Sequence, residues 1–282
     1  MKIIFTTFTD EKMKKSRNRI CKQAKAMNVY DEIIGYGKKD LSIEFSNNYQ
    51  QVLNSNIRGY GFWIWKPQII KQKMMEMEYG DILHYVDAGC HFNESGKQRL
   101  REYFKIAEDS ESGVVVFSPK DHPSEIIEGA ACINWPIYKY TKGDMLDFFN
   151  ARENHRLNQS QIICGTTFLI KKTKISIEII NRWSEITRNL KLMDDTRSSG
   201  GEIDGFIKHM CDQSAFSLLL KDYSVDVISN YEIEYPDLIN KNKLNLKKMK
   251  NYPIHAKRDR GISLINRAIR KINSFLDKKN SS

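Results

Sequence analysis

Short apolar runs alternate with longer amphipathic segments along this chain. Runs rich in β-branched and aromatic residues predict buried strands, and apolar positions three or four residues apart predict helices. We expect strands at residues 2–7, 30–34, 82–86, 113–117, 162–170 and 225–228. We expect helices at residues 10–27, 41–54, 68–78, 97–108, 142–149, 175–192 and 207–221. Strands that alternate with helices indicate an α/β fold with a mostly parallel sheet flanked by helices.

Two segments have the composition of loops, residues 118–134 and 194–205. The second is rich in glycine and serine, which is typical of a surface loop or of a mobile lid. The expected strand at 162–170 contains Gly165, and a glycine inside a strand indicates a bulge or the close approach of a ligand.

The composition is that of a globular protein with a substantial core. The chain has 282 residues, of which 40% are hydrophobic and 28% are charged. It contains no apolar run of about 18 residues, and its first residues have the pattern of a strand rather than of a signal peptide. The five cysteines are widely spaced and form no CxxC pair, which argues against a disulfide framework and a structural zinc site. We therefore expect a cytoplasmic protein.

The formal net charge of +10 is concentrated towards the C-terminus. Basic residues strongly outnumber acidic ones over 241–279, whereas the preceding chain is close to balance. A nucleic-acid-binding protein would interleave basic and aromatic residues along one face. Because the basic residues cluster in a tail instead, we expect no nucleic-acid partner.

The tail at 261–282 has a pattern of its own. Its isoleucines recur at helical spacing and its lysines and arginines supply another face. This predicts a basic amphipathic helix, which either lies on an anionic membrane surface or docks on the preceding domain. We therefore divide the chain into a domain at 1–260 and a tail at 261–282.

The most informative stretch is RGYGFWIWKPQIIKQKMMEMEYGDILHYVDAGCHFN, residues 58–93. The expected strand at 82–86 ends in Asp87, which is followed by the small residues Ala88 and Gly89. A carboxylate at the carboxyl end of a central strand lies where open α/β sheets bind ligands, and small residues allow a ligand to approach the backbone. The alternative is an ordinary turn that the aspartate caps.

Three later segments complete a pattern: the strand CGTTFLI, a helix bearing DQSAF, and a late histidine, His255. This order resembles nucleotide-sugar glycosyltransferases of the GT-A fold, in particular the glycogenin-like and bacterial lipopolysaccharide galactosyltransferase type. It is most similar to small bacterial enzymes of O-antigen and capsule clusters, which carry RGYGYWxWKP and GDIxxYxDAGC stretches. The resemblance covers most of residues 1–260.

The resemblance implies a single GT-A-like (Rossmann-like) domain with hexosyltransferase activity. The donor would be a nucleoside-diphosphate sugar, with a UDP-sugar favoured. The acceptor would be a glycan or a lipid-linked glycan of a bacterial surface polysaccharide, reached at the inner face of the cell membrane. A phosphosugar or phosphoramidate-type transferase of a capsule cluster is the alternative, because it would use the same sheet edge with a different donor.

The resemblance also assigns roles to individual residues. Asp212 and Gln213 match the Asp-Gln pair near the reacting face of the sugar, where a carboxylate or amide stabilises an oxocarbenium-like centre. The end of the first strand matches the nucleotide contact, where hydroxyls and amides would read the base and Phe8 would stack on it. The expected donor-binding residues are Thr7, Phe8, Thr9, Arg58, Lys66, Asp87, Ala88, Gly89, Lys257 and Arg258.

The related enzymes hold a divalent cation, Mn²⁺ or Mg²⁺, with an Asp-x-Asp motif that neutralises the donor diphosphate. Asp87 matches the first aspartate, but Gly89 stands at the third position. His255 either matches a late histidine ligand or is a surface histidine in a basic loop. If no metal binds, the diphosphate would be held by fixed cations, namely Arg58, Lys66, Lys257, Arg258 and Arg260.

Overall fold

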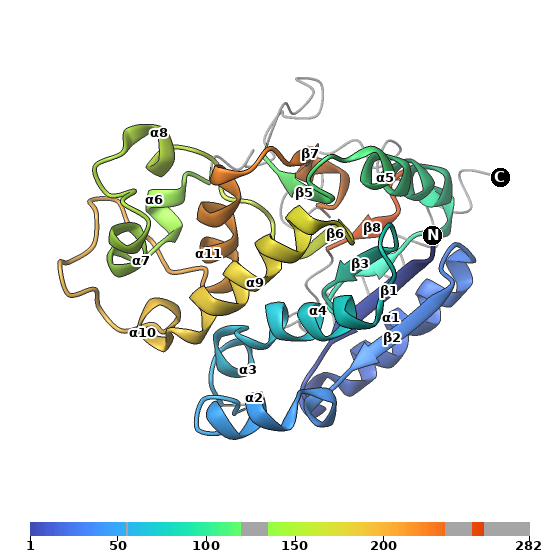
Figure 1. The fold of residues 1–282 in the computed structure, drawn as a ribbon, viewed down its shortest axis with the longest axis horizontal. Coiled ribbons are helices and arrows are strands. Elements are labelled where there is room, and N and C mark those ends of the chain that lie inside the picture. Colours follow the sequence, from blue (N-terminus) through green and yellow to red (C-terminus); the bar gives the residue numbers. More distant parts are fainter. Residues whose placement is uncertain (55, 120–134, 235–249, 257–282) are drawn as a thin grey trace, which may run out of the picture.

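The computed structural model describes the chain except for residues 55, 120–134, 235–249 and 257–282 (Figure 1). The strands are β1 (Ile3–Phe8), β2 (Glu32–Tyr36), β3 (Ile82–Val86), β4 (His91–Phe92), β5 (Val114–Ser118), β6 (Thr167–Lys171), β7 (Asp226–Ser229) and β8 (Ile254–His255). The helices are α1 (Lys14–Met27), α2 (Ile43–Asn48), α3 (Gly59–Phe62), α4 (Trp65–Glu76), α5 (Lys97–Asp109), α6 (Ile137–Tyr140), α7 (Gly143–Phe148), α8 (His155–Asn158), α9 (Lys174–Arg188), α10 (Leu190–Met193) and α11 (Asp212–Leu219).

Six strands form the central sheet, in the order β2-β1-β3-β6-β5-β7. The pairs β1–β2, β1–β3 and β5–β7 are parallel, and β6 runs antiparallel to both of its neighbours. A second, two-stranded sheet joins β4 to β8. The predicted α/β fold with a mostly parallel sheet is confirmed.

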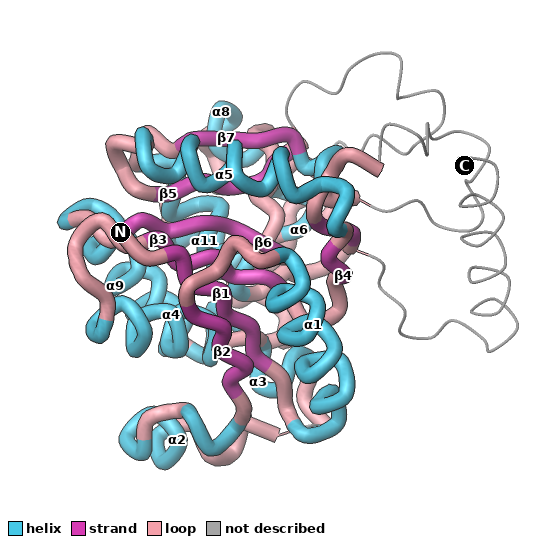
Figure 2. Tube along the Cα trace, turned by 90° about the vertical axis from the view of Figure 1, so that its right-hand side faces the viewer, coloured by secondary structure: helices cyan, strands magenta, loops and turns pink. Residues whose placement is uncertain are grey.

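Each face of the central sheet is covered by helices (Figures 1 and 2). In β3, Leu83 and Tyr85 belong to the core shared with α4, α9 and α11, whereas Ile82 and Val86 belong to the core shared with α1 and α5. Successive side chains of a strand point to opposite faces, so a strand that is buried on both faces reads as a continuous apolar run. This is why the run at 82–86 predicts a strand with the bounds of β3.

The parallel strands deliver their carboxyl ends to one edge of the sheet. β1 ends at Phe8 and β3 at Val86, and the antiparallel β6 begins at the same edge, because Val86 pairs with Thr167. The backbone N–H of Asp87 donates to the carbonyl of Thr166 over 2.8 Å. Residues that directly follow β1 and β3, and those that directly precede β6, therefore lie together.

Several predicted boundaries are wrong, for local reasons. The strand expected at 162–170 begins only at Thr167, so Gly165 lies in the preceding turn rather than inside a strand. The helix expected at 207–221 begins at Asp212, because Cys211 has φ 47° and ψ −115°, which no helix accommodates. The helix expected at 68–78 begins at Trp65, and it includes Pro67 in its first turn, where a missing N–H costs no helical hydrogen bond.

The segment at 194–205 is a loop, as predicted, and it is tied to residues 142–152. Lys142 Nζ donates to Asp194 over 2.8 Å, and the Glu202 carboxylate accepts from the backbone N–H groups of Gly143 and Ser198. These contacts hold the loop against the domain. Of the two alternatives, the arrangement is that of a surface loop.

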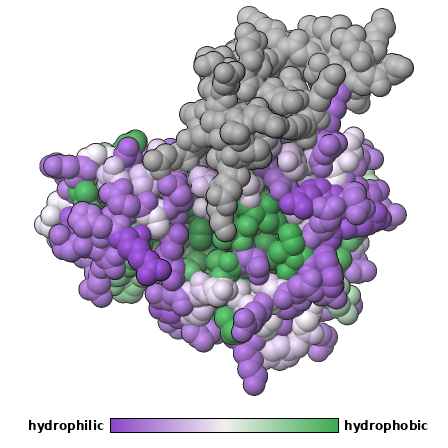
Figure 3. Space-filling view, turned by 90° about the horizontal axis from the view of Figure 1, so that it is seen from above, coloured by the Kyte–Doolittle hydropathy of each residue, from purple (hydrophilic) through white to green (hydrophobic). Residues whose placement is uncertain are grey.

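The basic tail at 261–282 and most of the loop-rich segment at 118–134 lie outside the described residues. Among the residues that the structure describes, no helix has both the length and the apolar content needed to cross a bilayer. One face carries apolar side chains between polar margins (Figure 3).

Candidate active site

Three charged side chains from different elements meet at the carboxyl edge of the sheet. Lys66, in the first turn of α4, places its Nζ 2.9 Å from Asp212 Oδ2 and 3.6 Å from Asp87 Oδ1. Lys66 Nζ also donates to the carbonyl of Gly165 over 3.0 Å. Asp87 follows β3 and Asp212 begins α11, so one ammonium group joins the central sheet to a helix distant in sequence.

The three side chains differ in their access to solvent. The side chains of Lys66 and Asp212 are 3% and 5% exposed, whereas that of Asp87 is 35% exposed. The hydroxyl of Tyr85 donates to Asp87 Oδ1 over 2.6 Å and fixes the carboxylate. Asp87 is therefore the member of the group that a ligand reaches first, with the buried ion pair behind it.

Burial and charge act in opposition on this group. Burial lowers the pKa of Lys66, but the carboxylates of Asp212 and Asp87 outweigh it and raise the pKa above its ordinary value. Burial raises the pKa of Asp212 to about 6, against the opposing effect of Lys66. The ammonium of Lys66 therefore lies between two carboxyl groups, and the buried one, Asp212, is the one whose pKa is raised.

Gln213 lies beside this group. A β-carbon added at Gly165 would stand 3.3 Å from Gln213 Cβ and 3.4 Å from its Oε1, so the glycine lets the amide approach the backbone. Gln213 Nε2 is buried and has no hydrogen-bond partner among the described residues. Because a buried amide donor without a partner is costly, this atom is available to a bound ligand.

Arg58 is not an open cation at this site. Its guanidinium forms an ion pair with Asp195 and donates to the carbonyl of His209 over 3.0 Å. It also lies 3.0 Å from Cys211 Sγ. Arg58 therefore holds the backbone immediately before Asp212, at the strained residue Cys211. The contact between Arg58 and a diphosphate stays a prediction.

The chain around Arg58 has an unusual backbone. All five residues from Gly59 to Trp63 have positive φ, including Tyr60, Phe62 and Trp63, which are not glycine. Left-handed residues with side chains are uncommon and cost about 1–3 kcal/mol each, and they cluster at functional sites. This turn leads into α4 and so sets the position of Lys66.

The end of β1 supplies buried hydroxyls. Thr7 and Thr9 are buried, and their Oγ1 atoms have no hydrogen-bond partner among the described residues. Phe8 is 4% exposed and stacks on Trp65, with ring centroids 4.1 Å apart. The ring expected to stack on a base is thus already covered by a tryptophan of α4.

The residues after Asp87 differ in accessibility. A β-carbon added at Gly89 would have no neighbour within 4 Å, so open space lies above this residue, as the sequence predicts for a ligand approach. Ala88 is buried, and its carbonyl accepts from Arg19 Nη2 over 2.6 Å, as does that of Cys90 over 2.8 Å. Sequence reasoning missed Arg19, because it lies in a polar helix that reads as solvated surface.

The residues at this edge do not form a complete site for a divalent cation. Such cations take several oxygen ligands, and within the part of the chain that the structure describes no three His, Cys, Asp or Glu side chains come together. Gly89 offers no carboxylate, and the ammonium of Lys66 lies near both Asp87 and Asp212. His255 belongs to β8 and pairs in register with His91. Lys257, Arg258 and Arg260 lie outside the described residues.

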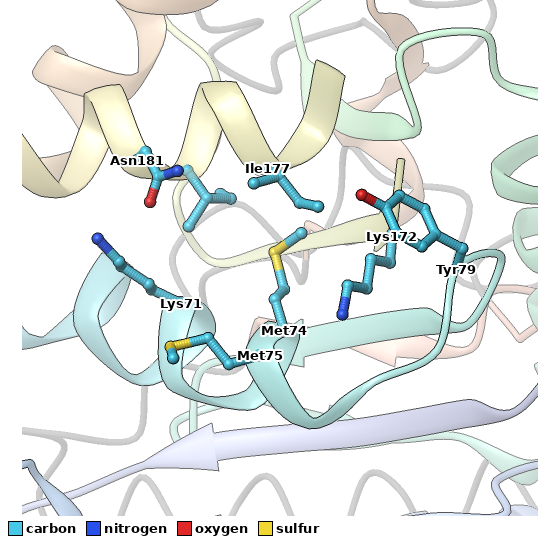
Figure 4. Close-up of a pocket in the computed structure, with 8 residues that line it drawn as sticks. Lys71, Met74, Met75, Tyr79, Lys172, Ile177 and Asn181 are labelled. Atoms are coloured by element: carbon cyan, nitrogen blue, oxygen red, sulfur yellow. The ribbon is translucent and has the colours of Figure 1, made fainter. Parts of the chain in front are cut away.

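A separate cavity of about 450 Å³ lies between α4 and α9 (Figure 4). It is lined by Met74 and Ile177, with Lys71 and Lys172 at its margins. Lys172 follows β6, at the edge of the sheet where β3 begins. This cavity is therefore at the opposite edge from Asp87 and does not belong to the candidate active site.

No family profile matches the chain, and no curated protein matches it by sequence. The fold is similar to solved glycosyltransferases. One, involved in glycosylation of the major capsid of PBCV-1, aligns over 90% of this chain and 93% of its own, at 10% identity and a TM-score of 0.45. Mouse xyloside xylosyltransferase 1 aligns over 91% of this chain and 97% of its own, at 8% identity and a TM-score of 0.47.

The galactosyltransferase LgtC, solved with donor and acceptor sugar analogues, aligns over 89% of this chain and 86% of its own, at 11% identity and a TM-score of 0.42. These three likenesses concern the fold of chains with very different sequences. What this chain does is therefore argued from its own residues.

Proposed function

We propose that this chain is a glycosyltransferase that moves a hexose from a nucleoside-diphosphate sugar, with a UDP-sugar favoured, to a glycan or lipid-linked glycan of a bacterial surface polysaccharide. The observation that carries the proposal is the group at the carboxyl edge of the sheet. There Lys66 joins the accessible carboxylate of Asp87 to the buried carboxylate of Asp212, with the amide of Gln213 beside them.

In the transfer, the bond between the anomeric carbon and the diphosphate oxygen breaks. A bond from an acceptor hydroxyl oxygen to that carbon forms, and the hydroxyl proton passes to the leaving diphosphate. Positive charge develops on the sugar ring as the first bond lengthens, and a carboxylate held in a dry site stabilises such charge strongly. Asp212 has this environment, because its carboxylate is 5% exposed and fixed by Lys66.

The remaining side chains have supporting roles in this proposal. Asp87 accepts hydrogen bonds from hydroxyls of the donor, and Gln213 donates its free Nε2–H to the sugar. The unpartnered hydroxyls of Thr7 and Thr9 bind the nucleoside at the end of β1. Lys66 holds the carboxylates of Asp87 and Asp212 in place. Lys257 and Arg258 of the basic C-terminal segment supply positive charge opposite the diphosphate, so the reaction does not depend on a resident metal.

Replacement of the buried carboxylate tests the proposal. Asp212→Asn keeps the side-chain volume but removes the negative charge, and we expect kcat to fall by about 10²–10³-fold, as for the loss of one preorganised electrostatic contact. Release of UDP from a panel of UDP-sugars, each offered with an oligosaccharide acceptor, measures this. Asp222→Asn, at an exposed carboxylate that pairs with Arg182, is the matched control.

Full activity of Asp212→Asn would remove the basis of the assignment. The same assay with EDTA decides the metal question, because activity within about twofold of the untreated enzyme is expected if side-chain cations hold the diphosphate. Loss of activity in EDTA that Mn²⁺ restores would contradict the metal-independent mechanism while leaving the transferase assignment intact.

A further inference from the structure

A second cavity lies away from Asp87, between α6, α8 and the segment at 194–205. Its volume of about 440 Å³ is within the range of roughly 300–1,000 Å³ that is usual for small-molecule sites. The residues that line it include Tyr138, Glu153, Asn158, Gln159 and Asp204. Amide, carboxylate and aromatic side chains gathered in one cavity match a ligand with many hydroxyl groups.

The side-chain amide of Asn158 is a fixed polar group in the lining of this cavity. The residue is 4% exposed, and its Nδ2 donates to the carbonyl of Arg152 over 2.9 Å, which fixes the orientation of the amide. The other end of the amide, Oδ1, is buried and accepts no hydrogen bond from the described residues. A buried acceptor without a donor is uncommon in a folded protein, and a ligand hydroxyl would satisfy it.

The charges around the cavity select against an anion. Arg152 is neutralised by Asp147, to which it donates two hydrogen bonds of 2.6 and 2.9 Å. The other acidic and basic side chains of the lining are the two acids Glu153 and Asp204 and one histidine, His155. The acids outnumber the histidine, which disfavours phosphate and nucleotide groups. A neutral polyhydroxylated ligand is therefore favoured over the donor.

The wall of the cavity is held in place. Gly205 packs against the ring of Tyr138, where an added β-carbon would stand 3.4 Å from Cε2. Glu202, just before the lining residue Ile203, accepts from the backbone of Gly143 over 2.6 Å. A preformed site loses little entropy when a ligand binds.

Hydrogen bonds also connect the wall of the cavity to the helix that carries Asp212. Tyr138 lies on α6, and the carbonyl of Tyr140, at the end of α6, accepts from Ser214 Oγ over 2.7 Å and from the backbone of Met210 over 3.0 Å. Ser214 is two residues after Asp212 in α11. One short helix thus contacts both the cavity and the helix that carries the buried carboxylate.

We propose that this cavity binds a neutral sugar unit of the acceptor glycan, at a subsite separate from the reacting centre. That the bound sugar belongs to the acceptor rests on the proposed transferase function. That the cavity binds a neutral sugar does not. Saturation-transfer NMR on the full chain, without donor, tests it with methyl glycosides of glucose, galactose, mannose and N-acetylglucosamine, and with lactose and maltose.

We expect at least one of these sugars to bind, and Asn158→Ala and Gln159→Ala each to weaken binding by about tenfold, the effect of one lost hydrogen bond. Arg156→Ala, an exposed residue of the same helix that does not line the cavity, is the matched control and leaves binding unchanged. Asp212→Asn also leaves sugar binding unchanged, so failure of the transferase assignment and failure of this subsite are distinguished.

Gln159 is exposed, so its variant decides the matter if Asn158→Ala does not fold. The proposal is overturned if none of the sugars binds, if both variants bind as the wild type does, or if UDP alone displaces the sugar.

Discussion

Lys66 connects the parts of the candidate site, because its ammonium group lies between the carboxylates of Asp87 and Asp212. Its ammonium lies within 3.6 Å of one carboxylate and 2.9 Å of another. Buried ion pairs of this kind do not by themselves stabilise a fold, since desolvation offsets most of the attraction. The ion pair at this strand end is therefore weak evidence for a stabilising role.

Replacement of Lys66 tests how much its ammonium group contributes to stability. Lys66→Met removes the ammonium and leaves Asp212 buried without a partner, so we expect the free energy of unfolding to fall by about 3–5 kcal/mol. Urea denaturation followed by circular dichroism measures this. Lys71→Met, at a half-buried lysine of the same helix, is the control and should change stability little. Equal effects of the two substitutions would mean that Lys66 contributes only through its aliphatic stem.

The raised pKa of Asp212 predicts opposite pH dependences for activity and for stability. Because the ionised carboxylate is the active form, kcat should fall as the pH is lowered through about 6. The folded state holds this proton more tightly than the unfolded chain, so between the ordinary aspartate value and about 6 the contribution of Asp212 to stability increases as the pH falls.

Two measurements check this pair of expectations. A pH profile of kcat shows the pH at which activity falls on the acidic side. The control variant Asp195→Asn should lose activity at the same pH. The difference in melting temperature between the wild type and Asp212→Asn should shift in favour of the wild type as the solution is made more acidic over the same range. An acidic limb at the ordinary aspartate pKa would contradict the assignment to a desolvated carboxylate.

Among the elements, α11 owes its position to contacts made before it begins. Cys211 has φ 47° and ψ −115°, and Arg58 holds this residue by its contacts with Cys211 Sγ and with the carbonyl of His209. Arg58 directly precedes the left-handed run at 59–63, which leads into α4. The starts of the two helices that carry Asp212 and Lys66 are therefore joined by one guanidinium group.

We expect Arg58→Ala to lower kcat about tenfold, with little change in the KM for the donor. The substitution removes the contacts that fix the backbone before Asp212, while the donor-binding groups remain. Asp195→Asn removes only a surface ion pair, which contributes about 0–1 kcal/mol, and should have little effect on kcat. Steady-state kinetics of both variants separates the roles. A raised KM with unchanged kcat in Arg58→Ala would instead indicate direct contact with the donor.

At the scale of the whole molecule, the described residues place an accessible carboxylate at the carboxyl edge of the sheet, and the two cavities described above lie away from it. The basic tail adds a feature that the sequence alone describes. We propose that the tail at 261–282 holds the enzyme on the inner face of the cell membrane, near a lipid-linked acceptor, because its basic amphipathic pattern is suited to an anionic surface.

Deletion of residues 261–282 should release the protein from vesicles that contain phosphatidylglycerol, while transfer to a water-soluble acceptor is retained. Co-sedimentation at low and at high salt measures the electrostatic part of the binding. Vesicles of phosphatidylcholine alone provide the neutral control. Unchanged binding of the shortened chain would assign membrane contact, if any, to the domain instead.

The sequence by itself determined the elements whose patterns are local. β3 has its predicted bounds because a strand buried on both faces is a continuous apolar run. Asp87 is predicted from its place directly after such a run, whereas Asp212 is predicted from the resemblance of its Asp-Gln pair to that of glycosyltransferases. The mostly parallel sheet follows from the alternation of strands and helices.

Only the tertiary structure decided how these residues act together. The sequence predicts that Lys66 and Arg58 contact the donor, but it does not predict their partners in the fold. Packing turns Lys66 towards two carboxylates and Arg58 towards the backbone before α11. The start of α11 was missed because a strained residue, Cys211, overrides helical pattern. Charge partners and backbone strain arise between segments far apart in the chain, and the periodicity of any one segment carries no information about them.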